Sequence, residues 1–234
     1  MRLNDSEYVK NDSSRIGKDC LCPAVTRTAK YEDIPRLKEL WQSCFGDEPG
    51  YIDLFFDDLF SPDDYILLEV PVGNENTPIN ADNYKRGAND DMLILSSCIL
   101  LPCTLVTGSK THRISYLYAL CTDPAFQKHG FGRSLLHFAH SYCKSRGDAG
   151  IALVPAEDWL FSFYEAEDYK KAFNGKKQTE NHICYTKDVL THLKHTENYF
   201  GETIPDEHSL VGLFRRLDDT VGDFGTAYMA YPMN

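Results

Sequence analysis

The chain has 234 residues, of which 42% are hydrophobic and 12% aromatic, so it can bury a substantial core and is not disordered throughout. Its formal charge of −11 at pH 7 disfavours nucleic acid and anionic membrane surfaces, because binding to either needs clustered Lys and Arg. The same acidity favours a positively charged binding partner.

The first residues, Met1–Lys18, are polar and charged and lack the apolar core of a signal peptide. No later segment is long and apolar enough to span a bilayer, so we expect a cytoplasmic protein. The eight cysteines are scattered, which favours reduced thiols over a disulfide framework. Cys20 and Cys22 form a single CxC pair, short of the four ligands that tetrahedral zinc needs, and no metal is predicted.

The first half of the chain alternates between strand patterns and helical spacing. In order, these patterns predict a strand at Val25–Lys30, helices from about Glu32 to Gly46 and at Tyr51–Phe60, and strands at Tyr65–Val70 and Met92–Cys98. The last strand either extends or turns at Pro102 into a run through Val106. Between the last two strands, Pro71–Asp91 is rich in Asn, Asp, Gly and Pro and is predicted to be a surface loop.

The second half alternates more regularly. It predicts, in order, a strand at Arg113–Thr122, a helix at Gly130–Arg146, a strand at Gly150–Val154, a helix at Glu157–Tyr169, and strands at Ser209–Phe214 and Thr226–Tyr231. We therefore expect an α/β (α+β) fold, a mixed and mostly antiparallel sheet flanked by helices, with one parallel step around the Gly130–Arg146 helix.

Gln127, Gly130 and Gly132 lie between a predicted strand and a predicted helix. The first turn of a helix has unpaired N–H groups and a partial positive charge, which attract phosphate. Glycine there permits close approach and unusual backbone angles, and His129 and Arg133 add positive charge. This pattern predicts a phosphate-binding loop, although QxxGxG without its flanks is equally typical of a structural turn.

The flanks of this loop carry a family resemblance. LYALCTDPAFQKHGFGRSLL resembles motif A of the GCN5-related N-acetyltransferase (GNAT) superfamily: a hydrophobic strand, a Pro, Q/R-x-x-G-x-G/A and an amphipathic helix. ALVPAEDWLFSFYEAEDYKKAF is similar to the strand, tyrosine-bearing helix and strand that follow, and YEDIPRLKELWQSCFG to the family's first helix. The likeness spans roughly Val25–Phe173 and is nearest to bacterial members, so it implies no particular substrate.

The resemblance implies a cosubstrate and a site. Acetyl-CoA would bind where a bulge parts the strand at Leu120 from the strand at Leu153, with no metal. Its pantetheine would pair with the backbone of one strand, and its pyrophosphate would bind amides of the loop. The implied residues are Leu120, Cys121 and Thr122 for the pantetheine, and Gln127, Lys128, His129, Gly130, Phe131, Gly132 and Arg133 around the pyrophosphate.

The resemblance also implies that Tyr164 protonates the departing CoA sulfur, although its i, i+4 spacing from Leu160, taken alone, favours core packing. Two positions depart from the family pattern: Glu157 stands at a common Asn, and Asp168–Tyr169 at a common Gly–Phe. We take Glu157 as the general base for the amine. The other candidates are Glu69, Asp123, Tyr116 and Tyr118.

Four further features of the sequence allow other interpretations. A covalent route through Cys121 is disfavoured because no adjacent His would activate it. The pairs His137/His140 and His192/His195 lack a third metal ligand. Asp53, Asp57 and Asp58 line either an acceptor route or, preferably, a solvated helix face. A dinucleotide enzyme is disfavoured because Leu135 stands where a third glycine is needed.

We therefore predict direct transfer of an acetyl group to a primary amine of a small molecule or peptide, in a ternary complex. The main rival is a catalytically silent acyl-CoA-binding or regulatory domain. We expect an N-terminal extension at 1–22, a GNAT domain at 23–187 and a C-terminal extension at 188–234 that packs on or completes the same domain. A homodimer stays open.

Overall fold

The computed structural model describes residues 24–72, 84–85, 87–175, 180–200, 211–222 and 224–229. The predicted extension at 1–22, with Cys20 and Cys22, lies outside these residues, as does most of the predicted loop at 71–91. The described helices include none that is long and apolar enough to cross a membrane.

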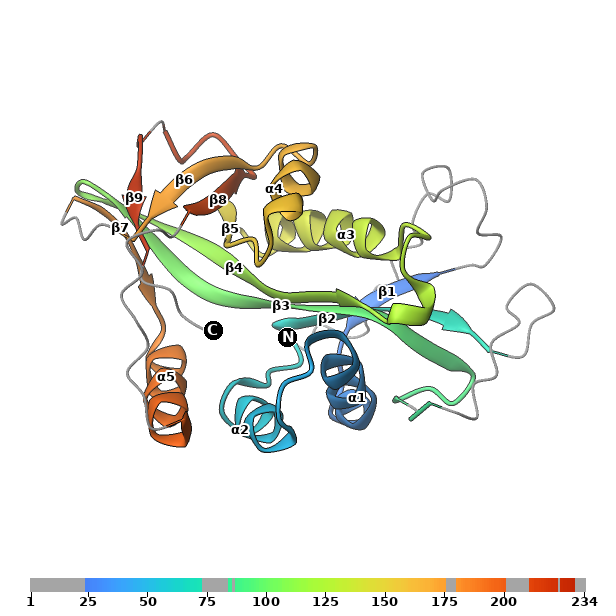
Figure 1. Cartoon of the computed structure of the whole chain (residues 1–234). Coiled ribbons are helices and arrows are strands. Elements are labelled where there is room, and N and C mark those ends of the chain that lie inside the picture. Colours follow the sequence, from blue (N-terminus) through green and yellow to red (C-terminus); the bar gives the residue numbers. More distant parts are fainter. Residues whose placement is uncertain are drawn as a thin grey trace, which may run out of the picture. The chain divides into compact units, whose positions relative to one another are not determined.

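The strands pair in the order β1-β2-β3-β4-β5-β8-β6-β9-β7, and β7 also pairs with β3. Figure 1 shows β3 and β4 side by side as long strands. The strand bounds are β1 Val25–Thr28, β2 Tyr65–Pro71, β3 Met92–Thr107, β4 Lys110–Thr122, β5 Gly150–Leu153, β6 Lys170–Asn174, β7 Asn181–Tyr185, β8 Val211–Arg216 and β9 Ala227–Tyr228.

Antiparallel pairing joins β1 to β2, β3 to β7, and β8 to both β5 and β6. Parallel pairing joins β4 to β5, and β9 to both β6 and β7. The helices are α1 Ile34–Phe45, α2 Pro49–Leu59, α3 Phe131–Ser145, α4 Asp158–Glu165 and α5 Lys187–Phe200. The predicted mixed α/β fold with a mostly antiparallel sheet is confirmed.

The chain divides into two compact units. The first contains residues up to Ile52, Ser61–Cys98 and Ala119–Phe138, and therefore β1, β2, α1 and the predicted phosphate loop. The second contains Asp53–Phe60, Ile99–Tyr118 and the residues from Ala139 onward. The strands β3 and β4 contribute residues to both.

Helix α1 shows why the first unit folds as predicted. Pro35 lies in its first turn, and Gly46 ends it with a left-handed φ of 74°, which glycine adopts without a steric cost. Leu37, Leu40 and Trp41 recur at helical spacing and are buried. Burial of each such side chain contributes on the order of 2 kcal/mol.

Five elements differ from, or complete, the sequence-based expectations. The sequence left open whether the strand ends at Pro102. Strand β3, 16 residues long in all, continues through this proline. Helix α5 and strand β7 were not predicted, because the hydrophobic periodicity weakens beyond Phe173. Two predicted C-terminal strands are confirmed as β8 and β9, although residues 209–210 of the first and 230–231 of the second lie outside the described part.

Candidate active site

The predicted phosphate loop leads directly into α3. Lys128 and Gly130 have left-handed φ values of 67° and 84°, and α3 begins at Phe131. The residues from Gln127 to Gly130 are exposed. This backbone presents the first turn of a 15-residue helix to its surroundings, the arrangement that binds anions at a helix N-terminus.

The two glycines serve this loop in different ways. A Cβ atom at Gly130 would meet open space, so the left-handed φ is what favours glycine there. A Cβ atom at Gly132 would lie 3.1 Å from Thr122 Oγ1, so this residue allows α3 to start close to the end of β4. Gln127 adds a second tie, because its side-chain amide donates to the Thr122 carbonyl at 3.2 Å.

Strand β4 is irregular just before the residues expected to contact pantetheine. Its pairing with β5 comprises Ser115 with Ile151 and Tyr116 with Ala152, both in the second unit. Ala119 then has a φ of 49°, which a non-glycine residue seldom adopts in a strand. A single left-handed residue of this kind is typical of a β-bulge.

The backbone after this irregularity is partly occupied by bonds within the first unit. The Cys121 carbonyl accepts from Ser96 Oγ at 2.5 Å, and the Thr122 carbonyl accepts from the Cys44 thiol at 3.4 Å. A carbonyl oxygen has two lone pairs, and the Cys44 thiol and the Gln127 amide together engage both of those on Thr122.

Two of the base candidates are held by arginine. Glu69 accepts two bonds from Arg27, with Nε–Oε1 at 3.0 Å and Nη2–Oε2 at 2.8 Å. Asp123 accepts from Arg36 at 2.7 Å. Both carboxylates are therefore engaged in ion pairs with arginine side chains.

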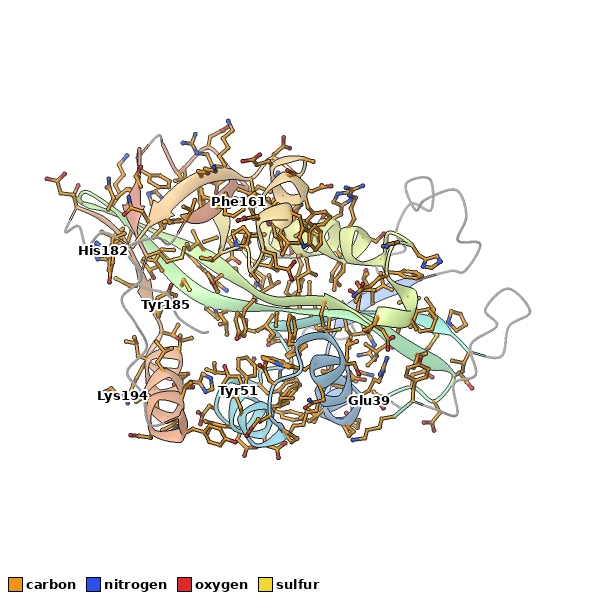
Figure 2. The ribbon with its side chains drawn as sticks, in the orientation of Figure 1. Glu39, Tyr51, Phe161, His182, Tyr185 and Lys194 are labelled. Carbon is orange, nitrogen blue, oxygen red and sulfur yellow. The ribbon has the colours of Figure 1, made fainter. Side chains whose placement is uncertain are left out.

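The two tyrosines among the base candidates belong to an aromatic row in the second unit. Tyr118 stacks on Phe55 of α2 with ring centroids 5.8 Å apart, and on Tyr116 at 6.4 Å. Tyr116 meets Tyr185, at the end of β7, edge to face at 6.3 Å (Figure 2). Tyr116 is buried, whereas Tyr118 and Tyr185 are half-buried.

Tyr164 lies on α4 in the second unit. Only 7% of it is exposed, and its ring packs edge to face on Phe163 at 5.1 Å and on Tyr169 at 5.5 Å. The ring of Tyr164 therefore packs in the protein interior, as its helical spacing suggested. Whether the hydroxyl reaches a thioester held by the loop stays a prediction, since the loop belongs to the first unit.

Glu157 is exposed and precedes α4 as its N-cap residue. The indole N–H of Trp159 donates to its Oε2 at 2.5 Å, which leaves Oε1 as the less committed oxygen. The Trp159 side chain that donates this bond is itself 64% exposed. Its role as base stays a prediction.

Cys121 is buried and close to two hydrogen-bonding groups of the first unit. Ser97 Oγ lies 3.6 Å from its sulfur, and the Cys44 thiol is hydrogen-bonded to it. The hydrogen bond between the two thiols raises the pKa of Cys44 and lowers the pKa of Cys121. The burial of Cys121 is nevertheless typical of a packed thiol.

A cluster that the sequence did not reveal joins α2 to α5. Asp58 accepts from His192 Nδ1 at 2.9 Å and from His195 Nδ1 at 2.9 Å. Burial alone would raise the pKa of Asp58, but the hydrogen bonds from both histidines lower it below its usual range. The preference for a solvated Asp58 was therefore wrong, whereas Asp53 and Asp57 are exposed.

The i, i+3 histidine spacing was the available signal for this cluster, but its partner lies 134 residues away in the sequence. No group of three or more His, Cys, Asp or Glu side chains arranged to hold a metal ion occurs among the residues that the structure describes.

A loop that offers a helix N-terminus to an anion, next to an irregular strand in an α/β fold, is typical of proteins that bind a phosphorylated cosubstrate. The sequence profile of the acetyltransferase (GNAT) domain matches residues 25–172. The chain therefore belongs to the GNAT acetyltransferase domain family, a family of acyltransferases. A search of curated protein sequences found no match.

Solved structures resemble the chain at low identity. The GCN5-related N-acetyltransferase from Anabaena variabilis ATCC 29413 is 14% identical over 64% of this chain and 33% of its own, with a TM-score of 0.50. That from Kribbella flavida is 10% identical over 65% and 34%, with a TM-score of 0.48. A GNAT family acetyltransferase from Brucella melitensis, solved with acetyl-CoA, is 14% identical over 70% and 97%, with a TM-score of 0.47.

The likeness to the Anabaena structure supports the fold alone. The chain matches only about a third of the length of the first two of these proteins.

Proposed function

We propose that the protein transfers an acetyl group from acetyl-CoA to a primary amine by direct attack in a ternary complex. The observation that carries this proposal is the backbone from Lys128 to Phe131, whose left-handed residues lead into the N-terminus of α3. Amides from Lys128 to Arg133 would hold the pyrophosphate, with His129 and Arg133 adding positive charge. Backbone groups at Leu120, Cys121 and Thr122 would pair with pantetheine.

The chemistry requires a neutral amine and a protonated leaving group. An alkylamine has a pKa of about 10.4 and must lose a proton before its nitrogen attacks the thioester carbonyl. Glu157, directly or through water, takes that proton. The carbon–sulfur bond then breaks, and Tyr164 donates its proton to the departing CoA thiolate. Fixing both reactants in one site supplies much of the rate enhancement.

The acceptor is proposed to be a cation before it reacts. In the aromatic row of Phe55, Tyr118, Tyr116 and Tyr185, the half-buried rings of Tyr118 and Tyr185 can attract an ammonium group, and Tyr118 directly precedes the irregular residue Ala119. The net charge of −11 favours the same class of acceptor. A small molecule and a peptide N-terminus both fit this chemistry.

Two measurements test the function. Calorimetry should detect CoA binding by the folded protein, and mass spectrometry should detect acetylated product when polyamines, aminoglycosides and peptides are offered with acetyl-CoA. No CoA binding would contradict the proposal. Binding without transfer to any amine would favour the silent acyl-CoA-binding domain instead.

Tyr164→Phe tests the general acid. Because the phenol acts only on the leaving thiolate, we expect kcat to fall by a factor on the order of 100 while the affinity for acetyl-CoA stays nearly unchanged. The control is Phe163→Leu, which changes the packing beside Tyr164 but keeps its hydroxyl. Full turnover by Tyr164→Phe would refute the assignment.

A further inference from the structure

A buried arginine of α1 reaches the segment that precedes the phosphate loop. Arg36 is fully buried, and its Nη2 donates to Asp123 Oδ2 at 2.7 Å. Its Nε and Nη2 donate to the Ile94 carbonyl at 3.2 and 3.1 Å, and its Nη1 donates to Glu39 on the same helix at 2.7 Å. The guanidinium is therefore held in one orientation by three acceptors.

Asp123 uses its other oxygen on the chain that follows. Its Oδ1 accepts from the Ala125 amide at 3.0 Å and so caps the 3-10 turn Pro124–Phe126. Its own amide donates to the Leu95 carbonyl at 2.8 Å, and its carbonyl accepts from the Phe126 amide at 2.8 Å. One carboxylate thus connects α1 with the turn from which Gln127 and the phosphate loop emerge.

A second contact holds the end of the same turn. The Tyr84 ring lies under the Arg36 guanidinium at 4.7 Å and beside the ring of Phe126 at 6.3 Å. All of these residues belong to the first unit. The turn is therefore fixed at Asp123 by an ion pair and approached at Phe126 by the aromatic ring that stacks on the same arginine.

The phosphate loop that follows this turn has a backbone conformation that must be held by its neighbours. It is exposed and contains Lys128 in a left-handed conformation, which costs an L-residue roughly 1–2 kcal/mol. A buried ion pair adds little net stability, because its attraction is offset by desolvation, but its geometry restricts where the joined segments can lie. Anion binding by backbone amides depends on that placement.

We propose that Arg36 and Asp123 are positioning residues for the diphosphate-binding loop, which they hold in its anion-binding conformation through the 3-10 turn Pro124–Phe126. The inference rests on the proposed function for its ligand. Neither side chain is assigned a contact with the cosubstrate; Asp123 acts through the turn, and Arg36 acts through Asp123.

The test compares two ligands that differ at the diphosphate. CoA contains it, whereas pantetheine ends before it. Asp123→Asn should weaken CoA binding about tenfold, a loss of about 1.4 kcal/mol, and leave pantetheine binding unchanged. Arg36→Lys keeps the charge but cannot reach all three acceptors, so it should shift the ratio of the two dissociation constants in the same direction by a smaller factor.

Asp33→Asn is the matched control. Asp33 is another fully buried carboxylate of the first unit and pairs with Arg27 at 2.7 Å, and it is not bonded to the turn. We expect it to lower stability without changing the ratio of CoA to pantetheine affinity. A folded Asp123→Asn with the wild-type ratio, or an equal change in Asp33→Asn, would overturn the proposal.

Hydrogen exchange provides a readout that needs no ligand. In the free protein, the Arg36→Lys and Asp123→Asn variants should exchange amides 125–133 faster than wild type, whereas Asp33→Asn should not. If wild type fails to bind CoA, the proposed function fails while this exchange result still decides the positioning role. Unchanged exchange in a folded Arg36→Lys variant would contradict that role, even where Asp123→Asn does not fold.

Discussion

At the scale of single residues, Glu157 combines a proposed proton-accepting role with an exposed position and a bond from Trp159. Glu157→Gln keeps the side-chain shape but cannot accept a proton, so we expect kcat/KM to fall by a factor on the order of 100 and the limb of the pH–rate profile that reports the base to disappear. Asp158→Asn removes a neighbouring exposed carboxylate and should preserve both limbs. An unchanged profile in Glu157→Gln would exclude it as the base.

Asp168 departs from the family pattern at a position with an unusual backbone angle. It stands where the family commonly has glycine, and its φ of 64° is the left-handed angle that glycine favours. Asp168→Val should lower the free energy of unfolding by about 1–2 kcal/mol relative to Asp168→Gly, because a β-branched residue is strained there. Both substitutions remove the exposed ion pair with Arg215, so urea unfolding of the two variants isolates the backbone effect. Equal stability would show that the angle relaxes.

At the scale of elements, α5 is attached to α2 through Asp58, and Figure 1 shows the two helices near each other. Burial lowers the pKa of His192 and outweighs the Asp58 carboxylate, which raises it. The unfolded chain therefore binds a proton more readily than the folded one, so stability falls as the pH drops below about 6.5, by at most about 1.4 kcal/mol per pH unit for this proton. The lowered pKa of Asp58 adds a further loss at more acidic pH, below about 3.9.

His192→Gln tests this linkage through thermal unfolding at pH 7.5 and pH 5.5. The wild-type midpoint should fall more between these values than the midpoint of the variant, which has lost the titrating group. His137→Gln, which removes an exposed histidine of α3, should retain the wild-type dependence. A pH dependence that is identical in all three proteins would show that His192 does not control it.

At the scale of the whole chain, what could be predicted depended on sequence-local signals. Helix α3 and strand β5 were placed to within a residue because apolar spacing and the glycines at 130 and 147 mark their ends. The Asp58–His192 bond and the Arg36–Asp123 ion pair join residues 134 and 87 positions apart, and no local pattern reports such a distance. The role of Tyr164 came from the family resemblance, and that of Glu157 from its position where the strand leads toward the helix that carries Tyr164. The packing of Tyr164 came only from the structure.

The C-terminal segment provides the last prediction. Strand β8 lies in the predicted extension at 188–234 but pairs with both β5 and β6, and its Leu213 and Phe214 are buried. A chain that ends at Lys187 would leave both neighbours without this ladder and lose two apolar side chains worth roughly 1.5–3 kcal/mol each. We expect it to lose cooperative thermal unfolding, whereas a chain that ends at Met229 should retain it. Cooperative unfolding of the shorter chain would make 23–187 an autonomous domain, and its loss would show that the segment completes the same one.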